Sequence, residues 1–210
     1  MLDICEQKMG KYPWGLYDIV LAPPGYLFGG MEYPGMNYVS STTLDMGRLT
    51  TRPNYAFSQM VAHEMIHSWF GDAMTPRYTK DAWLSEGITV FMELEVMEEI
   101  YGEEIGMFIR RRKFSSLKNA ILGYADSLRV LTPYLFEVHP FEGLNYVVYN
   151  KGALFLEYLA NFTSRSEVES TLRSFVDMFY FRSVDTEDFL HVLRQTQPQT
   201  KVCNKYFCTF

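Results

Sequence analysis

His63-Glu64-Met65-Ile66-His67 contains two of the four histidines of the chain, four residues apart, with a glutamate beside the first. Residues i and i+4 of an α-helix lie on one face, so a helix over this stretch would present both imidazole rings to a single metal ion. The pattern is H-E-x-x-H, in which the two histidines bind zinc and the glutamate is the general base. We expect this helix to start near Asn54, a favourable N-cap residue, and to run to about Trp69.

Two histidines alone do not hold zinc firmly, and a third ligand is found downstream, in Trp83-Leu84-Ser85-Glu86-Gly87. Eighteen residues separate His67 from Glu86, which lies in a second segment with helical apolar periodicity. Two histidines, one carboxylate and an open fourth position are typical of a catalytic zinc site. The alternative is that the histidines are satisfied polar groups on a half-buried helix and that Glu86 is a surface charge, but the spacing favours the zinc site.

The composition is that of a folded domain with no basic surface for nucleic acid. The 210 residues suit one domain, or one and a fraction, and they are 48% apolar and 16% aromatic. The net charge of −6 leaves no basic footprint, so no nucleic-acid partner is expected. The three cysteines, Cys5, Cys203 and Cys208, indicate neither a disulfide framework nor a cysteine zinc site.

The sequence contains no sign of a membrane span or of a signal peptide. No uninterrupted apolar run approaches the ~20 residues that a spanning helix needs. The first residues, MLDICE, lack the basic start and the apolar centre of a signal peptide. These features slightly favour a cytoplasmic location.

The apolar periodicity predicts a few N-terminal strands followed by a mainly helical part, which is an α+β fold. Residues 1–10 form a predicted helix that stops at Gly10, and 16–22 and 36–40 are predicted strands. The double glycine at 29–30 lets the backbone come close to a neighbouring strand or a bound peptide. The rest of the chain is expected to form a polar loop over 72–81, irregular chain over 131–143, and helices over 83–101, 103–122, 146–161, 165–180 and 186–195.

Three further features are interpreted as having no part in the site. The basic run Arg110-Arg111-Arg112-Lys113 is expected on a solvated helix face. His139 stands beside a proline in the irregular region, and His191 lies on the last predicted helix. Neither histidine is expected to bind metal.

Three separated motifs resemble those of the gluzincin aminopeptidases, the zinc aminopeptidase family of the aminopeptidase N and leukotriene hydrolase type. His63-Glu64-Met65-Ile66-His67 with Glu86 resembles the zinc signature of this family. Gly29-Gly30-Met31-Glu32 resembles its exopeptidase motif, and Tyr149-Asn150-Lys151-Gly152-Ala153 resembles the segment that carries its catalytic tyrosine. The motifs occur in the order of the family, and similarity extends over roughly residues 10–190.

The resemblance implies a thermolysin-like catalytic domain with one zinc ion. His63, His67 and Glu86 would be the zinc ligands, and Glu64 would activate the attacking water. Tyr149 would hydrogen-bond the oxyanion that develops during the reaction.

The resemblance also implies how a substrate would be held. Glu32 would bind the free α-ammonium group of a peptide, while Gly29, Gly30 and Met31 would offer their backbone along it. The implied function is that of a zinc aminopeptidase, which hydrolyses N-terminal residues from peptides with a free N-terminus.

Two positions depart from the family pattern without removing a ligand. Tyr33 stands where Asn is usual, and Ser85 stands where Asn or Asp is common beside the zinc glutamate. Two alternatives to the aminopeptidase therefore stay open. One is a zinc endopeptidase or other hydrolase of the same fold, and the other is a non-catalytic interaction module that retains the fold.

Members of the family also carry domains that this chain does not contain. We assign residues 1–195 to the catalytic domain, incomplete relative to the family, and 196–210 to a C-terminal tail. Surfaces that meet other domains in the family would be exposed as apolar patches. We therefore expect the chain to associate through these surfaces and to be weakly active alone.

Overall fold

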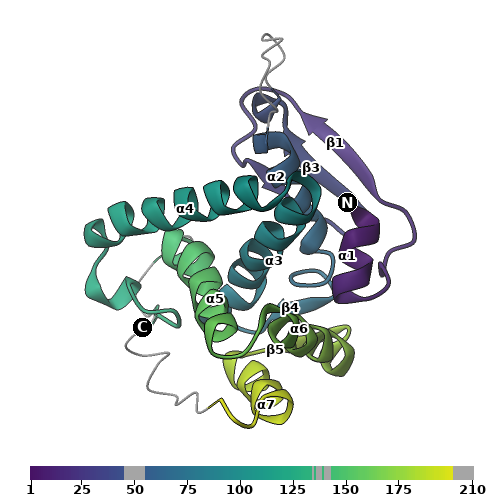
Figure 1. The fold of residues 1–210 in the computed structure, drawn as a ribbon. Helices are drawn as coiled ribbons and strands as arrows, with labels where there is room; N and C mark the ends of the chain where they lie inside the picture. Colours follow the sequence, from purple (N-terminus) through teal and green to yellow (C-terminus); the bar gives the residue numbers. More distant parts are fainter. Residues whose placement is uncertain (45–54, 134, 136–138, 140–142, 201–210) are drawn as a thin grey trace.

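A computed structural model describes residues 1–44, 55–133, 135, 139 and 143–200 (Figure 1). The expected N-cap Asn54 lies outside the described residues, as does most of the expected tail, 201–210. The described part has a few strands near its N-terminus followed by a mainly helical part, so the predicted α+β class is confirmed.

Helix α3, Trp83–Tyr101, is the centre of the fold, and its predicted bounds are confirmed. Every residue from Trp83 to Met97 is buried except Glu86, which is half-buried. Such all-round burial requires neighbours on every side. Helices α2 (Tyr55–Ile66), α4 (Glu103–Ala120) and α5 (Gly152–Phe162) supply them, and Figure 1 shows α3 between α4, α5 and α2.

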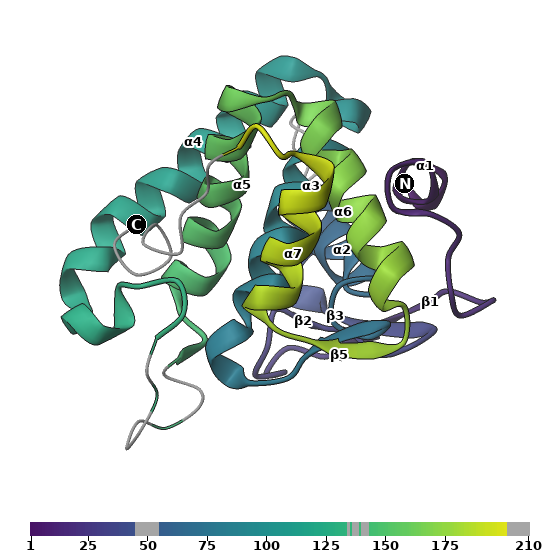
Figure 2. The same cartoon turned by 90° about the horizontal axis from the view of Figure 1, so that it is seen from below.

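A small sheet of three strands covers α2 on one side (Figure 2). It consists of β1 (Asp18–Ala22), β2 (Gly30–Met31) and β3 (Met36–Ser40), in the order β1-β3-β2. Strands β1 and β3 are parallel, whereas β2 and β3 are antiparallel. In this order β2 forms one of the two edges of the sheet, and it contacts α2.

The remaining predicted helices are confirmed with small shifts of their ends. They are α1 (Leu2–Met9), α6 (Arg165–Phe179) and α7 (Thr186–Thr196). Helix α7 begins with a capping box in which Asp185 and Asp188 exchange side chain to backbone hydrogen bonds. Short helical turns lie at Ser41–Thr43, Thr79–Asp81, Ile121–Gly123 and Asp126–Leu128. No described helix is both long and apolar enough to cross a membrane.

The structure corrects the predicted end of one helix and the prediction of one loop. The α2 helix ends at Ile66 rather than near Trp69. The expected polar loop over 72–81 contains a strand, β4 (Met74–Pro76), which pairs in parallel with β5 (Arg182–Val184). Strands of three residues are too short to show a period, and their partners are more than 100 residues apart in sequence, so local pattern did not reveal them.

The prediction that the basic run is a solvated face is wrong for Arg110. Its side chain is 10% exposed and forms ion pairs with Glu95, Glu98 and Glu157. These partners belong to α3 and α5, so the guanidinium joins three helices. A buried charge needs such partners, because an unpaired ion in the interior is costly.

Candidate metal centre

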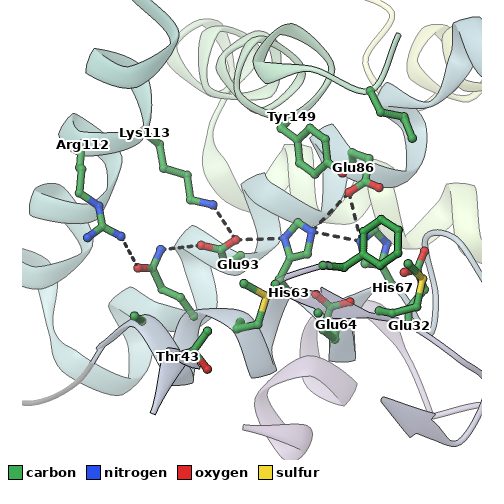
Figure 3. A pocket seen from close by; sticks show the side chains of 18 residues that line it. Glu32, Thr43, His63, Glu64, His67, Glu86, Glu93, Arg112, Lys113 and Tyr149 are labelled. Atoms are coloured by element: carbon green, nitrogen blue, oxygen red, sulfur yellow. Dashed lines mark hydrogen bonds and ion pairs between the residues drawn. The ribbon is translucent and has the colours of Figure 1, made fainter. Parts of the chain in front are cut away.

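The three predicted zinc ligands converge on one point. Nε2 of His63 and Nε2 of His67 are 3.1 Å apart, and Oε2 of Glu86 lies 3.3 Å and 3.2 Å from them. Figure 3 shows the three side chains pointing toward one another. The two Nε2 atoms and the carboxylate oxygen therefore all face one point, where they could bind a shared cation.

The triangle of donor atoms fits a zinc ion. Tetrahedral zinc with bonds of about 2.0–2.1 Å sets its ligand atoms about 3.3–3.4 Å apart. The measured edges of 3.1–3.3 Å match that spacing. Two histidines and one carboxylate are also the donors of catalytic zinc sites, with a fourth position left for water or substrate.

Secondary structure brings the ligands together. His63 is in the last turn of α2, and His67 follows the helix directly, with its backbone nitrogen still 3.3 Å from the carbonyl oxygen of His63, so the two stand one turn apart as the i, i+4 spacing predicted. Glu86 is in the first turn of α3. Burial disfavours charge on Glu86, but the neighbouring His67 and His63 outweigh burial and lower the pKa of its carboxyl group. Glu86 is therefore an anion, as a zinc ligand must be.

The Nδ1 atom of each histidine, which points away from the other predicted ligands, also has a hydrogen-bond partner. Nδ1 of His67 lies 2.8 Å from the carbonyl oxygen of Phe70, with Ser85 Oγ at 3.2 Å and Thr89 Oγ1 at 3.3 Å. An Nδ1–H donating to a carbonyl leaves the Nε2 lone pair free for a metal. Ser85, which departs from the family pattern, thus contacts a predicted zinc ligand.

Glu93 holds His63 in the same way, and the sequence analysis missed it. Its Oε2 lies 3.1 Å from Nδ1 of His63 and 2.8 Å from Nζ of Lys113, while Gln59 donates to its Oε1 at 2.8 Å. Burial disfavours its charge, but Lys113 and His63 lower the pKa of Glu93 to about 2. Glu93 follows Glu86 by seven residues, which is two helical turns on one face, and that spacing was the available signal.

We expect Glu93→Gln to weaken zinc binding about 10–100-fold, the range known for partners that orient metal ligands. The amide keeps the shape of the side chain but removes the negative charge that orients His63. Competition with a fluorescent chelator measures the zinc Kd. Glu104→Gln on the exposed face of α4 is the matched control. An unchanged Kd in a folded Glu93→Gln protein would contradict the assignment.

Glu64, the predicted base, points from α2 toward the sheet edge. A Cβ atom on Gly30 would lie 2.1 Å from Oε1 of Glu64, so only glycine permits this approach of β2 to the carboxylate. The double glycine therefore lets β2 approach α2, rather than only another strand or a peptide. Burial of Glu64, 4% exposed, raises its pKa to about 7.

Glu32 stands directly after β2 and shares a second cluster with Glu64 and His67. One ligand atom from each of these three residues lies within 4.8 Å of the others. This cluster could also hold a cation, but it places two carboxylates together and contains only one histidine. It suits an ammonium group better than zinc.

Tyr149 lies on a turn of π-helix, Val147–Lys151, which precedes α5. Its ring stacks on the ring of His63, with centroids 6.0 Å apart and planes at 18°. Burial and the nearby Glu86 raise the pKa of the phenol, so it keeps its proton and can donate. The predicted helix over 146–161 thus begins with an irregular turn, of a kind frequent at functional sites.

Two glycines let the turn that carries Tyr149 come close to the predicted metal ligands. A Cβ atom on Gly87 would lie 2.8 Å from Cα of Gly152, and one on Gly152 would lie 2.8 Å from Cα of Gly87. The backbones of α3 and α5 therefore touch at the residues that follow Glu86 and Lys151. Larger side chains here would move Tyr149 away from the predicted metal ligands.

All of the predicted site residues line one cleft of about 720 Å³. They are Gly29, Gly30, Met31, Glu32, His63, Glu64, His67, Glu86 and Tyr149. The cleft is lined in addition by residues that the sequence analysis left out, among them Gln59, Glu93, Arg112 and Lys113. His191 is not among them and pairs instead with Gln195 on the surface.

Comparison with known proteins identifies the family. Residues 1–206 match the peptidase family M1 domain. The chain belongs to peptidase family M1. This M1 chain is 34% identical over 192 residues to leukotriene A-4 hydrolase of Xenopus laevis, covering 90% of this chain and 30% of that protein. It is 30% identical over 200 residues to aminopeptidase B of Rattus norvegicus, and this match covers 93% of this chain and 30% of that protein.

The fold of the M1 chain agrees with that of a solved relative. It matches leukotriene A4 hydrolase of Saccharomyces cerevisiae with a TM-score of 0.85, at 29% identity, over 95% of this chain and 31% of that chain. The family resemblance drawn from the three motifs is thus confirmed. The M1 chain spans about a third of the length of the curated relatives it matches.

Proposed function

We propose that this M1 domain is a zinc aminopeptidase, which hydrolyses N-terminal residues from peptides with a free N-terminus. The observation that carries the proposal is the position of Glu32, whose carboxylate lies within 4.8 Å of Glu64 and His67. An anionic group at that distance can bind the α-ammonium of a peptide while the first carbonyl group of the same peptide lies at the proposed metal ligands. One relative of the chain is itself an aminopeptidase, aminopeptidase B.

The proposed zinc ligands are His63, His67 and Glu86. Glu93 would orient His63, and the Phe70 carbonyl would orient His67, each through the Nδ1 atom of the ring. Zinc would supply Lewis-acid chemistry, which lowers the pKa of water and polarises a carbonyl. Glu64 would take the proton of the attacking water and deliver it to the leaving amine. The buried position of Glu64 suits this task, because burial makes its carboxylate a stronger base.

Tyr149 would donate a hydrogen bond to the carbonyl oxygen as negative charge develops on it. The backbone of β2 would lie along the substrate, with Gly29, Gly30 and Met31 as its neighbours. Because the Glu32 carboxylate lies within 4.8 Å of His67, a peptide would have room for one residue between Glu32 and the proposed metal ligands. That arrangement would restrict cleavage to the first peptide bond.

Glu32→Gln tests this proposal against an endopeptidase of the same fold. The substitution removes the charge and keeps the shape, so we expect kcat/KM for peptides with a free amine to fall about 10–100-fold, the value of one charge-assisted hydrogen bond. N-acetylated peptides should be poor substrates of both proteins. Equal rates on blocked and free peptides in the unchanged protein would favour the endopeptidase, and no turnover of either would favour a non-catalytic module.

A further inference from the structure

The end of the cleft that lies away from Glu32 is basic. Arg112 and Lys113 from α4 lie there beside Glu93 (Figure 3), and Gln59 also lines the cleft. The other end holds Glu32 and Glu64 beside the metal ligands. The cleft is therefore polarised along its length, acidic at the proposed amine site and basic at the far end.

The two cations at the basic end are bound differently. Lys113 Nζ lies 2.8 Å from Oε2 of Glu93, so its charge is matched by a buried carboxylate. Nη2 of Arg112 donates a hydrogen bond to the amide oxygen of Gln59 at 2.8 Å. Within the part of the chain that the structure describes, no carboxylate forms an ion pair with Arg112. Its guanidinium thus faces the cleft with a positive charge that no described residue matches.

Helix α2 gives the distance between the two ends. His67, His63 and Gln59 are spaced by four residues, and a helix rises 1.5 Å per residue, so about 12 Å separates His67 from Gln59 along the axis. Glu32 is at the His67 end, and Arg112 is bonded to Gln59. An extended peptide covers about 3.3–3.6 Å per residue, so roughly three to four residues span this distance, or fewer when a long side chain covers its last part.

We propose that Arg112 binds a carboxylate that the substrate carries shortly after the scissile bond. The inference rests on the proposed aminopeptidase function, which places the amine at Glu32 and the rest of the peptide toward Arg112. A guanidinium can bind a carboxylate through two parallel hydrogen bonds, which makes it selective for that group. The carboxylate comes either from an acidic side chain at the second or third residue or from the C-terminus of a short peptide.

The test uses the full chain with zinc and two pairs of peptides that share one N-terminal residue. The first pair has Glu or Gln at the second position and an amidated C-terminus, and the second pair is a tripeptide as free acid or amide. We expect kcat/KM to favour the carboxylate about 10–100-fold in at least one pair. Arg112→Gln should abolish that preference, whereas Arg111→Gln, one residue away and exposed, should retain it. The pair that shows the preference identifies the source of the carboxylate.

A binding measurement separates this inference from the proposed function. In a Glu64→Gln background the same peptides are titrated by calorimetry, so the ratio of Kd values is obtained without turnover. If the unchanged protein hydrolyses none of the peptides but binds those with a carboxylate more tightly, and if this preference depends on Arg112, the aminopeptidase proposal is wrong and the assignment of Arg112 as an anion site stands. Peptide hydrolysis with no carboxylate preference, or with a preference that survives Arg112→Gln, would overturn the assignment of Arg112.

Discussion

Glu64→Gln should lower kcat by several orders of magnitude and leave zinc content unchanged. The amide has the shape of the carboxylate but cannot take a proton from water, and general-base catalysis alone accounts for about 10²–10⁴-fold. Burial already disfavours the charge of Glu64, and Glu64 is not one of the three proposed zinc ligands, so we expect the neutral amide to preserve folding and zinc binding. Steady-state hydrolysis of aminoacyl-arylamides by zinc-loaded protein measures the loss.

The matched control is Glu104→Gln, which changes the same group on the exposed face of α4 and should keep full activity. Zinc content and denaturant unfolding are measured on both variants. Near-normal turnover by a zinc-loaded Glu64→Gln protein would show that another group is the base.

Tyr149→Phe should lower kcat about 10²–10³-fold with little change in KM, the scale known for loss of one oxyanion donor, ~2.7–4 kcal/mol. The hydroxyl acts mainly in the transition state, where the carbonyl oxygen carries charge. The phenylalanine ring can still stack on His63, so zinc content should not change.

Tyr146→Phe is a close control, because Tyr146 lies three residues earlier and is 51% exposed. It should behave like the unchanged protein in kcat and KM. If Tyr149→Phe raised KM and spared kcat, the hydroxyl would contribute to ground-state binding, and the transition-state assignment would be wrong.

The part of the site that depends on local spacing could be predicted from the sequence. The i, i+4 spacing placed His63 and His67 on one face of a helix, and the periodicity from Trp83 to Tyr101 gave the bounds of α3. Glu86 could be singled out among the acidic residues of α3 by its distance from His67 and its flanking motif. Glu93 could not, although it lies two turns away on the same face, because nothing in its neighbours distinguishes it.

The features that were missed depend on contacts between distant segments. Arg110 is buried among Glu95, Glu98 and Glu157, which come from two other helices that are distant in sequence. Arg112 and Lys113 line the cleft, but Arg112 is also exposed, so the predicted solvated face is wrong for Arg110 and holds for Arg112. The pairing of Met74–Pro76 with Arg182–Val184 is also long-range, and each strand is too short to give a periodic signal.

The most direct test of the central claim, that His63, His67 and Glu86 hold a single zinc ion, is elemental analysis of zinc per chain after exhaustive dialysis. The account predicts one zinc per chain in the unchanged protein and in Glu64→Gln, and far less than one in His67→Ala and Glu86→Ala. Full zinc occupancy in folded Glu86→Ala protein, or a folded unchanged chain that retains no zinc after loading, would contradict it.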